Sequence, residues 1–391
     1  PGDLVDLPTR VALDRLPAGE DYSIAPYRND NPRNGLTTLD LLLITRHILR
    51  VEALDSPYKM IAADANRNGR ITALDLLALR KLLLVIDSNL VDNTSWRFVD
   101  AAYVFSDPFH PFDENFREVI NHNDLSGDFP VNNFIGIKIG DVNGTIQLDG
   151  LQSIENRNEL TNISWQIPDK TLQAGSQWTL ELDLHELEAC QGLQFALEID
   201  TRKLKWLDAK TEGSISINNI NADLLLNGIL LFSWNSLKEQ YENGKLKISF
   251  EALERVKISE AIKFSEKYLK PEAYWIKGFK NETALRGVQL MFLPENGTKL
   301  ANDVPKLLPN SPNPFRQNTS IRFYMPEEMS VFIEVFDVSG RIAFRETWPV
   351  QPAGWQTREI STGLQLPEGL YWCRFSTSGW SSVQKWVIQH R

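Results

Sequence analysis

The twelve residues from Asp64 to Asp75 read D-A-N-R-N-G-R-I-T-A-L-D and decide the fold of the N-terminal part of the chain. Oxygen-bearing side chains stand at positions 1, 3 and 5, a glycine follows at position 6, and a carboxylate closes the stretch at position 12. Calcium-binding loops have this spacing, with a backbone carbonyl at position 7 and a side chain or a water at position 9. An ordinary Asn/Gly turn does not require it. The predicted calcium ligands are Asp64, Asn66, Asn68, the carbonyl of Arg70, Thr72 and Asp75.

A second copy of the pattern lies earlier in the chain, because Leu36–Asp40 and the helix predicted after it repeat Ile71–Asp75 and its helix. Counting back from Asp40 places Asn29 at position 1 and Asn31 at position 3. This loop is irregular, since an arginine stands at position 5 and the glycine arrives one residue late. We expect it to bind calcium weakly unless a neighbouring or remote carboxylate helps. A metal-free turn is the alternative.

Two such loops, each followed by an amphipathic helix but preceded by none, resemble the type I dockerin domain. The resemblance covers about residues 28 to 86 and implies calcium binding and docking onto a cohesin partner. The chain departs from the family in its irregular first loop and in the residues inserted after the second helix. Nine of the 39 aromatic residues fall between Trp96 and Phe134, too many for a solvated tether. We therefore expect this insertion to pack.

The insertion ends in the phrase Asp141-Val142-Asn143-Gly144, which restarts a calcium loop without completing it. We expect Asp141, with Asn143 beside it, to return to the first loop and to supply the carboxylate that this loop lacks. The alternative is an ordinary turn that takes no part in calcium binding. The predicted metal ligands of the first site are therefore Asn29, Asn31, Asp40, Asp141 and Asn143.

Composition bounds the other possibilities. The chain has 391 residues, 42% of them hydrophobic, and a net charge of −10, so we expect roughly two to four domains with real cores. The negative charge disfavours nucleic acid and anionic membranes as partners and favours divalent cations. No run of eighteen apolar residues occurs, so we expect no membrane span. The chain begins at Pro1 without a leader, so any export signal is expected upstream or already removed.

Catalytic motifs are missing from the sequence. The five histidines form no H-E-x-x-H phrase, and neither a G-x-S-x-G elbow nor a P-loop occurs. His47, on the first predicted helix, is expected to pack or to cap that helix. Cys190 and Cys373 are expected to be buried thiols rather than a disulfide. We therefore expect that the chain is not an enzyme.

After Gly150 the hydrophobic period becomes two, as in half-buried strands. Strands broken by Gly, Asn and Asp at this spacing predict an antiparallel sandwich. The stretch Gln191–Asp200, followed by Leu204 and Trp206, resembles the first strands of cohesin-type sandwiches. The predicted strands are Trp178–Leu184, Leu193–Ile199, Ile229–Trp234, Leu246–Phe250 and Val288–Phe292.

A proline-rich stretch over residues 294–314 leads into a last domain of short strands. Its ordered motifs resemble the type A C-terminal sorting domain of the type IX secretion system of Bacteroidetes, over about residues 306 to 391. The resemblance implies that outer-membrane components of this system bind the domain. The motifs are Pro312–Phe315, Thr319–Phe323, Val335–Arg341, Leu366–Tyr371 and Lys385.

The terminal strand of this domain is the expected contact with the secretion machinery. A strand at the edge of a sheet leaves backbone donors and acceptors free for a partner. We expect Lys385–Ile388 to form such an edge, and cleavage after export within residues 302–309.

Together these observations predict a mainly β chain with a small α module: a dockerin-like calcium-binding helix pair followed by two antiparallel β-sandwich domains. The expected boundaries are 1–27 for the closing strand of an upstream β-domain, 28–150 for the dockerin-like module, 151–300 for the cohesin-like sandwich and 301–391 for the sorting domain.

The predicted role is that of a non-catalytic C-terminal region of a secreted cell-surface protein, which gives a calcium-stabilised stalk and a signal for type IX secretion. The alternative is a cellulosome-like scaffold component, whose dockerin binds a partner cohesin in carbohydrate degradation. A scaffold dockerin should expose an apolar helix face, whereas a stalk module should cover its helices with the aromatic insertion. An intramolecular dockerin–cohesin contact is also open, and exposure of Trp275 or Trp355 would favour a third role as a lectin.

Overall fold

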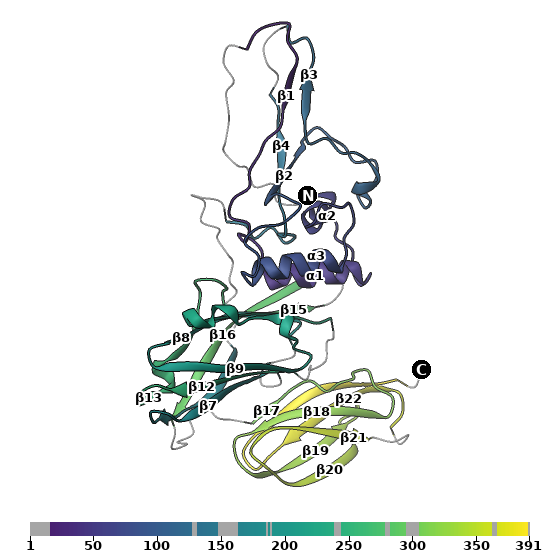
Figure 1. Cartoon of the computed structure of the whole chain (residues 1–391). Helices are drawn as coiled ribbons and strands as arrows, with labels where there is room; N and C mark the ends of the chain where they lie inside the picture. Colours follow the sequence, from purple (N-terminus) through teal and green to yellow (C-terminus); the bar gives the residue numbers. More distant parts are fainter. Residues whose placement is uncertain are drawn as a thin grey trace. The chain divides into compact units, whose positions relative to one another are not determined.

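Three α-helices lie within residues 38–83, and the other regular elements of the described chain are strands and short 3-10 turns (Figure 1). The computed structural model describes residues 16–126, 131–147, 163–184, 187, 190–237, 244–277, 282–294, 305–361 and 366–389. Contacts divide the chain into two compact units, Pro1–Leu293 and Pro294–Arg391. The fold class is confirmed: a mainly β chain with a small helical module and two β-sandwiches.

The helices begin where the sequence supplies caps. They span Thr38–Ile48 (α1), Pro57–Ala63 (α2) and Ala73–Leu83 (α3). At the start of α1 and of α3, a threonine at the N-cap and an aspartate three residues later bond reciprocally in a capping box. The duplicated sequence thus gives two helices of 11 residues with the same cap.

The insertion folds as a small β structure above the helices. Within it β2 pairs antiparallel with β4, and β3 pairs antiparallel with β1, which comes from the segment before the helices. Phe105 is buried against Tyr58 of α2, Tyr103 and Phe116, so the insertion is packed, as its aromatic content predicts. The elements are β1 (Tyr22–Ile24), β2 (Trp96–Asp100), η1 (Pro111–Asp113), β3 (Ile120–His122) and β4 (Phe134–Lys138).

The predicted closing strand near the N-terminus pairs within this module, since Tyr22 lies opposite His122 and Ile24 opposite Ile120. Residues 1–15 lie outside the described residues, so the link of residues 1–27 to an upstream β-domain stays a prediction.

The middle sandwich has strands β5 (Ile163–Asp169), β6 (Thr171–Leu172), β7 (Gln177–Asp183), β8 (Gly192–Ile199), β9 (Leu204–Gly213), β10 (Ile220–Asn221), β11 (Ile229–Asn235), β12 (Gly244–Ala252), β13 (Val256–Lys257), β14 (Ile262–Ser265), β15 (Glu272–Lys277) and β16 (Glu282–Pro294). One sheet has the order β10-β11-β8-β15-β16-β5 with β14 paired to β8, another has the order β7-β12-β9, and β13 pairs with β6. The predicted strands fall on β7, β8, β11, β12 and β16.

Large apolar side chains fill the space between the two larger sheets of this sandwich. Trp165, Phe195, Phe232 and Phe250 are each at most 1% exposed and belong to one cluster. Trp275 packs partly buried on the same cluster, with the guanidinium carbon of Arg286 5.2 Å from its ring. The ring is therefore not an exposed platform of the kind that the lectin alternative needs.

The C-terminal unit forms a second sandwich, with one sheet in the order β17-β18-β21 and the other in the order β20-β19-β22-β23. Phe323, Val335, Phe375 and Trp386 are completely buried between these sheets. Trp355 is half-buried beneath Arg322, whose guanidinium carbon lies 4.8 Å from its ring. The strands are β17 (Lys306–Leu307), β18 (Asn318–Met325), β19 (Met329–Phe336), β20 (Ile342–Gln351), β21 (Gly354–Ser361), β22 (Gly369–Ser376) and β23 (Ser381–Ile388).

The terminal strand β23 does not have the free edge that we expected around Lys385–Ile388. Although β23 ends its sheet, the carbonyl of Val387 accepts the N–H of Phe315 at 3.0 Å, and Asn313 Oδ1 accepts the N–H of Val387 at 2.9 Å. Asn313 Nδ2 also donates to the carbonyl of Lys385 at 2.8 Å. This prediction was wrong because the Pro312–Phe315 motif folds back along the strand and takes its backbone groups.

Three further expectations concern the chain as a whole. Cys190 and Cys373 are both buried thiols rather than a disulfide, as predicted. No helix in the described ranges is long and apolar enough to cross a membrane. Of the stretch predicted to be cleaved after export, residues 302–304 lie outside the described residues.

Candidate calcium-binding loops

The loop at Asp64–Asp75, here called loop two, wraps around the carboxylate of Asp64. Asp64 Oδ1 accepts the N–H of Asn68 at 3.0 Å, and Oδ2 accepts the N–H of Gly69 at 2.9 Å. Asn68 Oδ1 accepts the N–H of Arg70 at 2.9 Å. Gly69 has a φ of +75°, which a residue with a side chain rarely adopts. Asp64 is 1% exposed, so its charge lies inside the loop.

Asp75 closes loop two from the first turn of α3. Its Oδ1 accepts the N–H of Asn66 at 3.1 Å, and its Oδ2 accepts the N–H of Thr72 at 2.8 Å and the hydroxyl of Thr72 at 3.0 Å. Burial, and the nearby charge of Asp75, raise the pKa of Asp64, although the N–H groups of Gly69 and Asn68 oppose the shift. The loop therefore gathers two buried carboxylates with amide, hydroxyl and carbonyl oxygens, the donor set of a calcium site.

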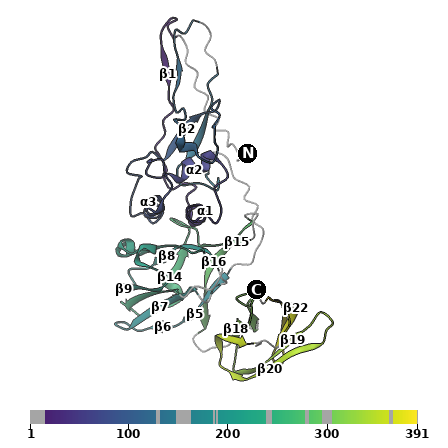
Figure 2. The same ribbon diagram turned by 90° about the vertical axis from the view of Figure 1, so that its right-hand side faces the viewer.

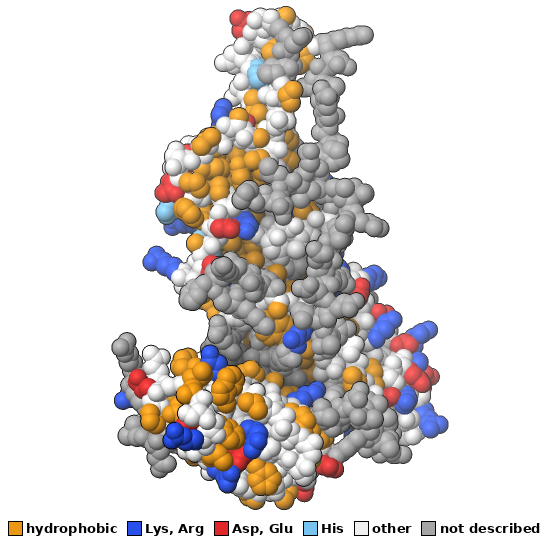
Figure 3. Space-filling model, turned by 180° about the vertical axis from the view of Figure 1, so that it is seen from behind, with side chains coloured by type: hydrophobic (Ala, Val, Ile, Leu, Met, Phe, Trp, Pro, Cys, Tyr) orange, Lys and Arg blue, Asp and Glu red, His pale blue; other side chains and the backbone are white. Residues whose placement is uncertain are grey.

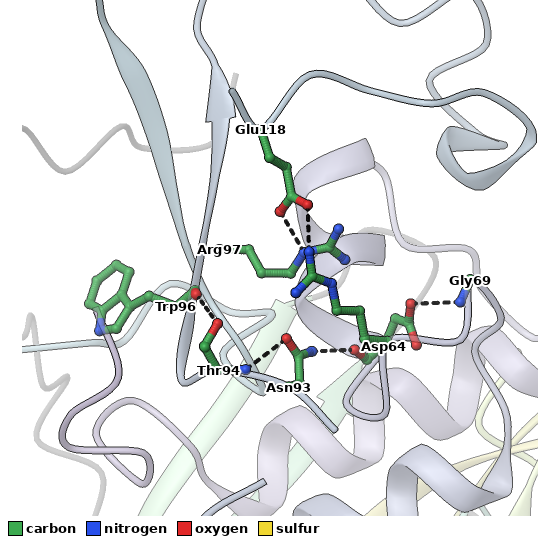
Figure 4. Close-up of polar contacts among 8 residues, drawn as sticks. Asp64, Gly69, Asn93, Thr94, Trp96, Arg97 and Glu118 are labelled. Carbon is green, nitrogen blue, oxygen red and sulfur yellow. Dashed lines mark hydrogen bonds and ion pairs between the residues drawn. The ribbon is translucent and has the colours of Figure 1, made fainter. Parts of the chain in front are cut away.

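The insertion holds loop two from outside (Figure 4). Asn93 Nδ2 donates to the carbonyl of Asp64 at 3.0 Å. Glu118 accepts bonds from Arg97 and Arg67, each at 2.8 Å, and Arg67 belongs to the loop itself. Sequence reasoning missed these three contacts, because a lone Asn, Arg or Glu inside an aromatic insertion carries no spacing signal.

The first loop is arranged differently from its expected numbering. Asn29 Oδ1 accepts the N–H of Ser95 at 2.9 Å, which ties Asn29 to the insertion. Asn31 has a φ of +42°, and its carbonyl accepts the N–H of Asn34 at 3.0 Å in a turn. Ligand roles for Asn29 and Asn31 stay a prediction, and the described contacts of both residues serve to shape the chain.

Asp40 lies instead beside the phrase that ends the insertion. Its Oδ1 accepts the N–H groups of Val142 at 2.9 Å and Asn143 at 3.2 Å. Asp40 is completely buried and Asp141 is 9% exposed. Burial, together with the neighbouring charge of Asp141, raises the pKa of Asp40 to about 8. The structure thus brings Asp40, Asp141 and Asn143 together from segments a hundred residues apart.

Lys138 is the nearest cation to this carboxylate pair. Its Nζ donates to the carbonyls of Pro32 at 2.7 Å and Ile139 at 3.0 Å, and it makes no ion pair with either aspartate within the described residues. Burial lowers the pKa of Lys138 to about 8. The described chain holds no group of three His, Cys, Asp or Glu side chains suited to a metal, so any calcium site here draws on amide, hydroxyl and carbonyl oxygens as well.

The helix pair packs on the middle sandwich (Figures 1 and 2). The N–H of Thr38 donates to Gln194 Oε1 of β8 at 2.7 Å, and Thr38 Oγ1 lies 2.7 Å from Ser233 Oγ of β11. All three side chains are at most 2% exposed. Because buried polar groups need partners, these bonds fix the position of α1 on the sheet.

Apolar side chains complete this contact. One buried cluster joins α1 and α3 to the sandwich, and its members include Leu41, Ile44, Leu79, Leu82, Ala196 and Leu231. Asn235 of β11 bonds to both helices, since its Nδ2 donates to Thr45 Oγ1 at 3.2 Å and its Oδ1 accepts a bond from Arg80. Aromatic side chains of the insertion pack on other parts of the same helical cluster. On the surface, hydrophobic side chains gather on the upper part of the N-terminal unit (Figure 3).

Two parts of the chain match known families. Residues 34–84 match the family model of the Dockerin type I domain, and residues 311–389 match that of the Secretion system C-terminal sorting domain. The chain is therefore that of a secreted Bacteroidetes protein attached at the cell surface, with a type IX sorting tail. Neither match reaches the middle sandwich, whose cohesin-like character stays a prediction.

Solved structures give only weak likenesses, and no protein of curated function matches the chain. A β-glucuronidase from Parabacteroides merdae has 13% identity and a TM-score of 0.17, with 57% of this chain and 30% of that one covered. A putative membrane anchored protein from Corynebacterium diphtheriae has 13% identity and a TM-score of 0.17, with 57% and 52% covered. Domains 3 and 4 of rat CD4 have 12% identity and a TM-score of 0.16, with 58% and 100% covered. The chain spans less than a third of the glucuronidase, and scores this low carry no argument.

Proposed function

We propose that this part of the secreted protein is a non-catalytic, calcium-stabilised stalk that ends in a type IX sorting domain. One observation carries the proposal: the helix face that a docking module would present is covered by the sandwich of the same chain, through Thr38, Leu41 and Ile44. A module packed in this way joins the insertion to the sandwich as one body. Calcium at loop two would hold the loop to α3 through Asp64 and Asp75.

The absence of catalysis is part of the same proposal. Among the described histidines, His47 accepts the N–H of Leu54 at the end of α1, His110 pairs with the exposed Asp107, and His122 bonds to Asn132. None of these arrangements joins a nucleophile to a base that a third group orients, as acyl transfer requires.

Replacing Asn235 with Ala tests the packing of the helices on the sandwich. We expect the free energy of unfolding to fall by about 1 to 3 kcal/mol, because Arg80 would keep a half-buried guanidinium that has lost its acceptor. Urea unfolding of the full chain measures the change. Ser249→Ala is the matched control, since the Ser249 hydroxyl bonds to the exposed Thr179 within the sheet β7-β12-β9, whereas Asn235 bonds to the helices from the other sheet. Equal stability of the two variants would contradict a helix module held by the sandwich.

Docking of a separate cohesin is the second candidate function, and α3 supplies the observation that favours it. Leu74 and Leu77 are 65% and 42% exposed, whereas their counterparts on α1, Leu39 and Leu42, are half-buried and buried. A complex with a separate cohesin domain that Leu77→Ser abolishes would support this candidate. If mixing with cohesin domains of the same bacterium gives no complex in analytical ultracentrifugation, the stalk role alone remains.

The secretion machinery is expected to bind the C-terminal domain on the outer face of its four-stranded sheet. Phe332, Ile342, Trp372 and Val383 are 43%, 48%, 43% and 56% exposed, and cross-strand pairing places them on one side of the sheet. We call these four residues the outer-face patch. Glu334 lies among them and bonds to both Arg345 and Arg374. Apolar groups around a paired charge cluster form the kind of surface that protein partners bind.

A further inference from the structure

The phrase at the end of the insertion and the first loop repeat the contacts of loop two. Asp64 accepts the N–H groups of the residues four and five positions ahead, at 3.0 and 2.9 Å. Asp141 does the same, with Thr145 at 3.0 Å and Ile146 at 2.8 Å. Asp141 therefore has the contacts of position 1 of a calcium loop.

The next positions agree as well. At position 3, Asn66 Oδ1 accepts the N–H two residues ahead at 3.1 Å, and Asn143 Oδ1 accepts the N–H of Thr145 at 3.1 Å. At position 4, the chain turns with a positive φ in both places, 56° at Arg67 and 74° at Gly144. Residues 141–146 thus follow the path of the first half of loop two.

The second half of the pattern comes from the other segment. Asp75 Oδ2 accepts the N–H and the hydroxyl of Thr72, and Asp40 Oδ2 accepts the N–H and the hydroxyl of Thr37 at 2.9 and 2.8 Å. Asp75 Oδ1 also accepts the N–H at position 3 of its own loop, whereas Asp40 Oδ1 accepts the N–H of Asn143 on the distant segment. The two halves are thus joined across the gap as they are in a continuous loop.

The gap in the chain falls between positions 6 and 7, where Ile146 meets Gly35. A Cβ at Gly35 would lie 2.6 Å from Asp141 Oδ2 and 2.9 Å from the Cα of Ile146, so a residue with a side chain there would displace the carboxylate or the backbone. Thr145 Oγ1 donates to the carbonyl of Gly35 at 3.1 Å. Asn34 and Gln147 bond to each other in both directions just beyond. The position-5 oxygen is thereby held beside the position-7 carbonyl.

We propose that Asp141, Asn143, Thr145, the carbonyl of Gly35, Thr37 and Asp40 form a second calcium-binding loop whose two halves come from distant segments of the chain. The proposal rests on the proposed calcium binding at loop two. It assigns positions 1 and 3 to Asp141 and Asn143 in place of Asn29 and Asn31. A divalent cation would offset the two buried carboxylates, which Lys138 does not pair with in the described chain. The Nδ2 atom of Asn143 is buried without a hydrogen-bond partner there, so this amide can turn to offer its oxygen at the cost of one bond.

In the split loop, the bound ion would hold the two ends of the insertion together. Residues between α3 and Asp141 leave the helix pair and return to it, and the ion would bind both Asp40 and Asp141 at the point of return. Calcium would therefore bind this loop only after the insertion has folded back.

Calorimetric titration of the metal-free full chain with calcium chloride tests the split loop. We expect two ions for the unaltered protein, and one of them bound roughly 10- to 100-fold more weakly, or lost, in Asp141→Asn. Thr145→Ala should weaken the binding of the same ion, and it changes no buried charge. Asp64→Asn should affect only the other ion, and Asn29→Ala should leave both in place.

Three other outcomes would contradict the split loop, and they differ in what they imply for calcium binding at loop two. One ion that Asp64→Asn removes and Asp141→Asn leaves unchanged would sink the split loop while loop two stands. Loss of the first-loop ion in Asn29→Ala but not in Asp141→Asn would return position 1 to Asn29. Binding of no ion by the unaltered, folded protein would dispose of both.

Discussion

Chelation of calcium with EDTA is expected to lower the melting temperature of the N-terminal unit by about 10 °C or more. An ion present at 100 times its dissociation constant stabilises the folded state by about 2.7 kcal/mol, because the unfolded chain has no site for it. Two ions would then contribute about 5 kcal/mol, and each kcal/mol moves the melting temperature of a large domain by about 2 to 4 °C. Without the ions, Asp64 lies beside Asp75 and Asp40 beside Asp141 with no cation between them, and burial raises the pKa of Asp64 and of Asp40 because a buried charge is unfavourable.

Calorimetric scans of the full chain in millimolar calcium and in EDTA measure this shift. The C-terminal unit has no calcium loop in its described residues, so its transition serves as an internal control. Magnesium should restore little of the loss, since it demands a smaller and more regular shell of oxygens. Identical scans in both solutions would refute a calcium-stabilised module.

Export should depend on the outer-face patch of the C-terminal domain. In a host with type IX secretion, a signal-bearing reporter fused to residues 300–391 should reach the surface about tenfold less when Phe332 and Trp372 are both replaced by Ser. Exposed aromatic residues at the centre of a contact carry most of its binding energy. Surface labelling of the reporter, normalised to its total amount, gives the measurement.

The control for this prediction is Val338→Ser, which removes an exposed apolar side chain, 74% accessible, from the hairpin turn outside the patch. Deleting residues 383–391 is a poorer test, because it removes the buried Trp386 and Ile388 and would unfold the domain. Equal export of the patch variant and the control would remove the patch as the contact.

Loop two could be predicted because its chemistry is local. Twelve consecutive residues carry all its oxygen donors, and Thr72 and Asp75, which cap α3, belong to the same twelve residues. The sorting domain could be predicted for a related reason, since its motifs occur in a fixed order along the chain and residues 311–389 match that family. In both cases the sequence itself holds the spacing that the structure uses.

The first loop shows the limit of counting positions along the chain. Counting back from Asp40 along the chain leads to Asn29, whose side chain bonds to Ser95. Only the unfinished phrase at Asp141 indicated a second segment, and it could not show that Gly35 meets Ile146. Register between segments a hundred residues apart depends on how the whole insertion folds, which no periodic pattern records.

Contacts made by single polar residues could not be predicted at all. Thr38, Gln194 and Ser233 join the helices to the sandwich, yet each is an isolated residue without a partner at any fixed spacing. The wrong expectation of a free edge at Lys385–Ile388 has a similar cause. Pro312–Phe315 was identified only as a motif of the sorting domain, whereas Asn313 and Phe315 bond along β23.

Hydrogen exchange at backbone amides is the most direct test of whether calcium holds the helix module against the sandwich. The N–H groups of Gly69, Ile146 and Thr38 report on loop two, on the split loop and on the contact with β8. We predict that all three are protected in calcium and exchange at least about tenfold faster in EDTA, while Val335 in the C-terminal domain is unchanged. Equal exchange rates at these three amides in calcium and in EDTA would contradict a helix module that calcium holds against the sandwich.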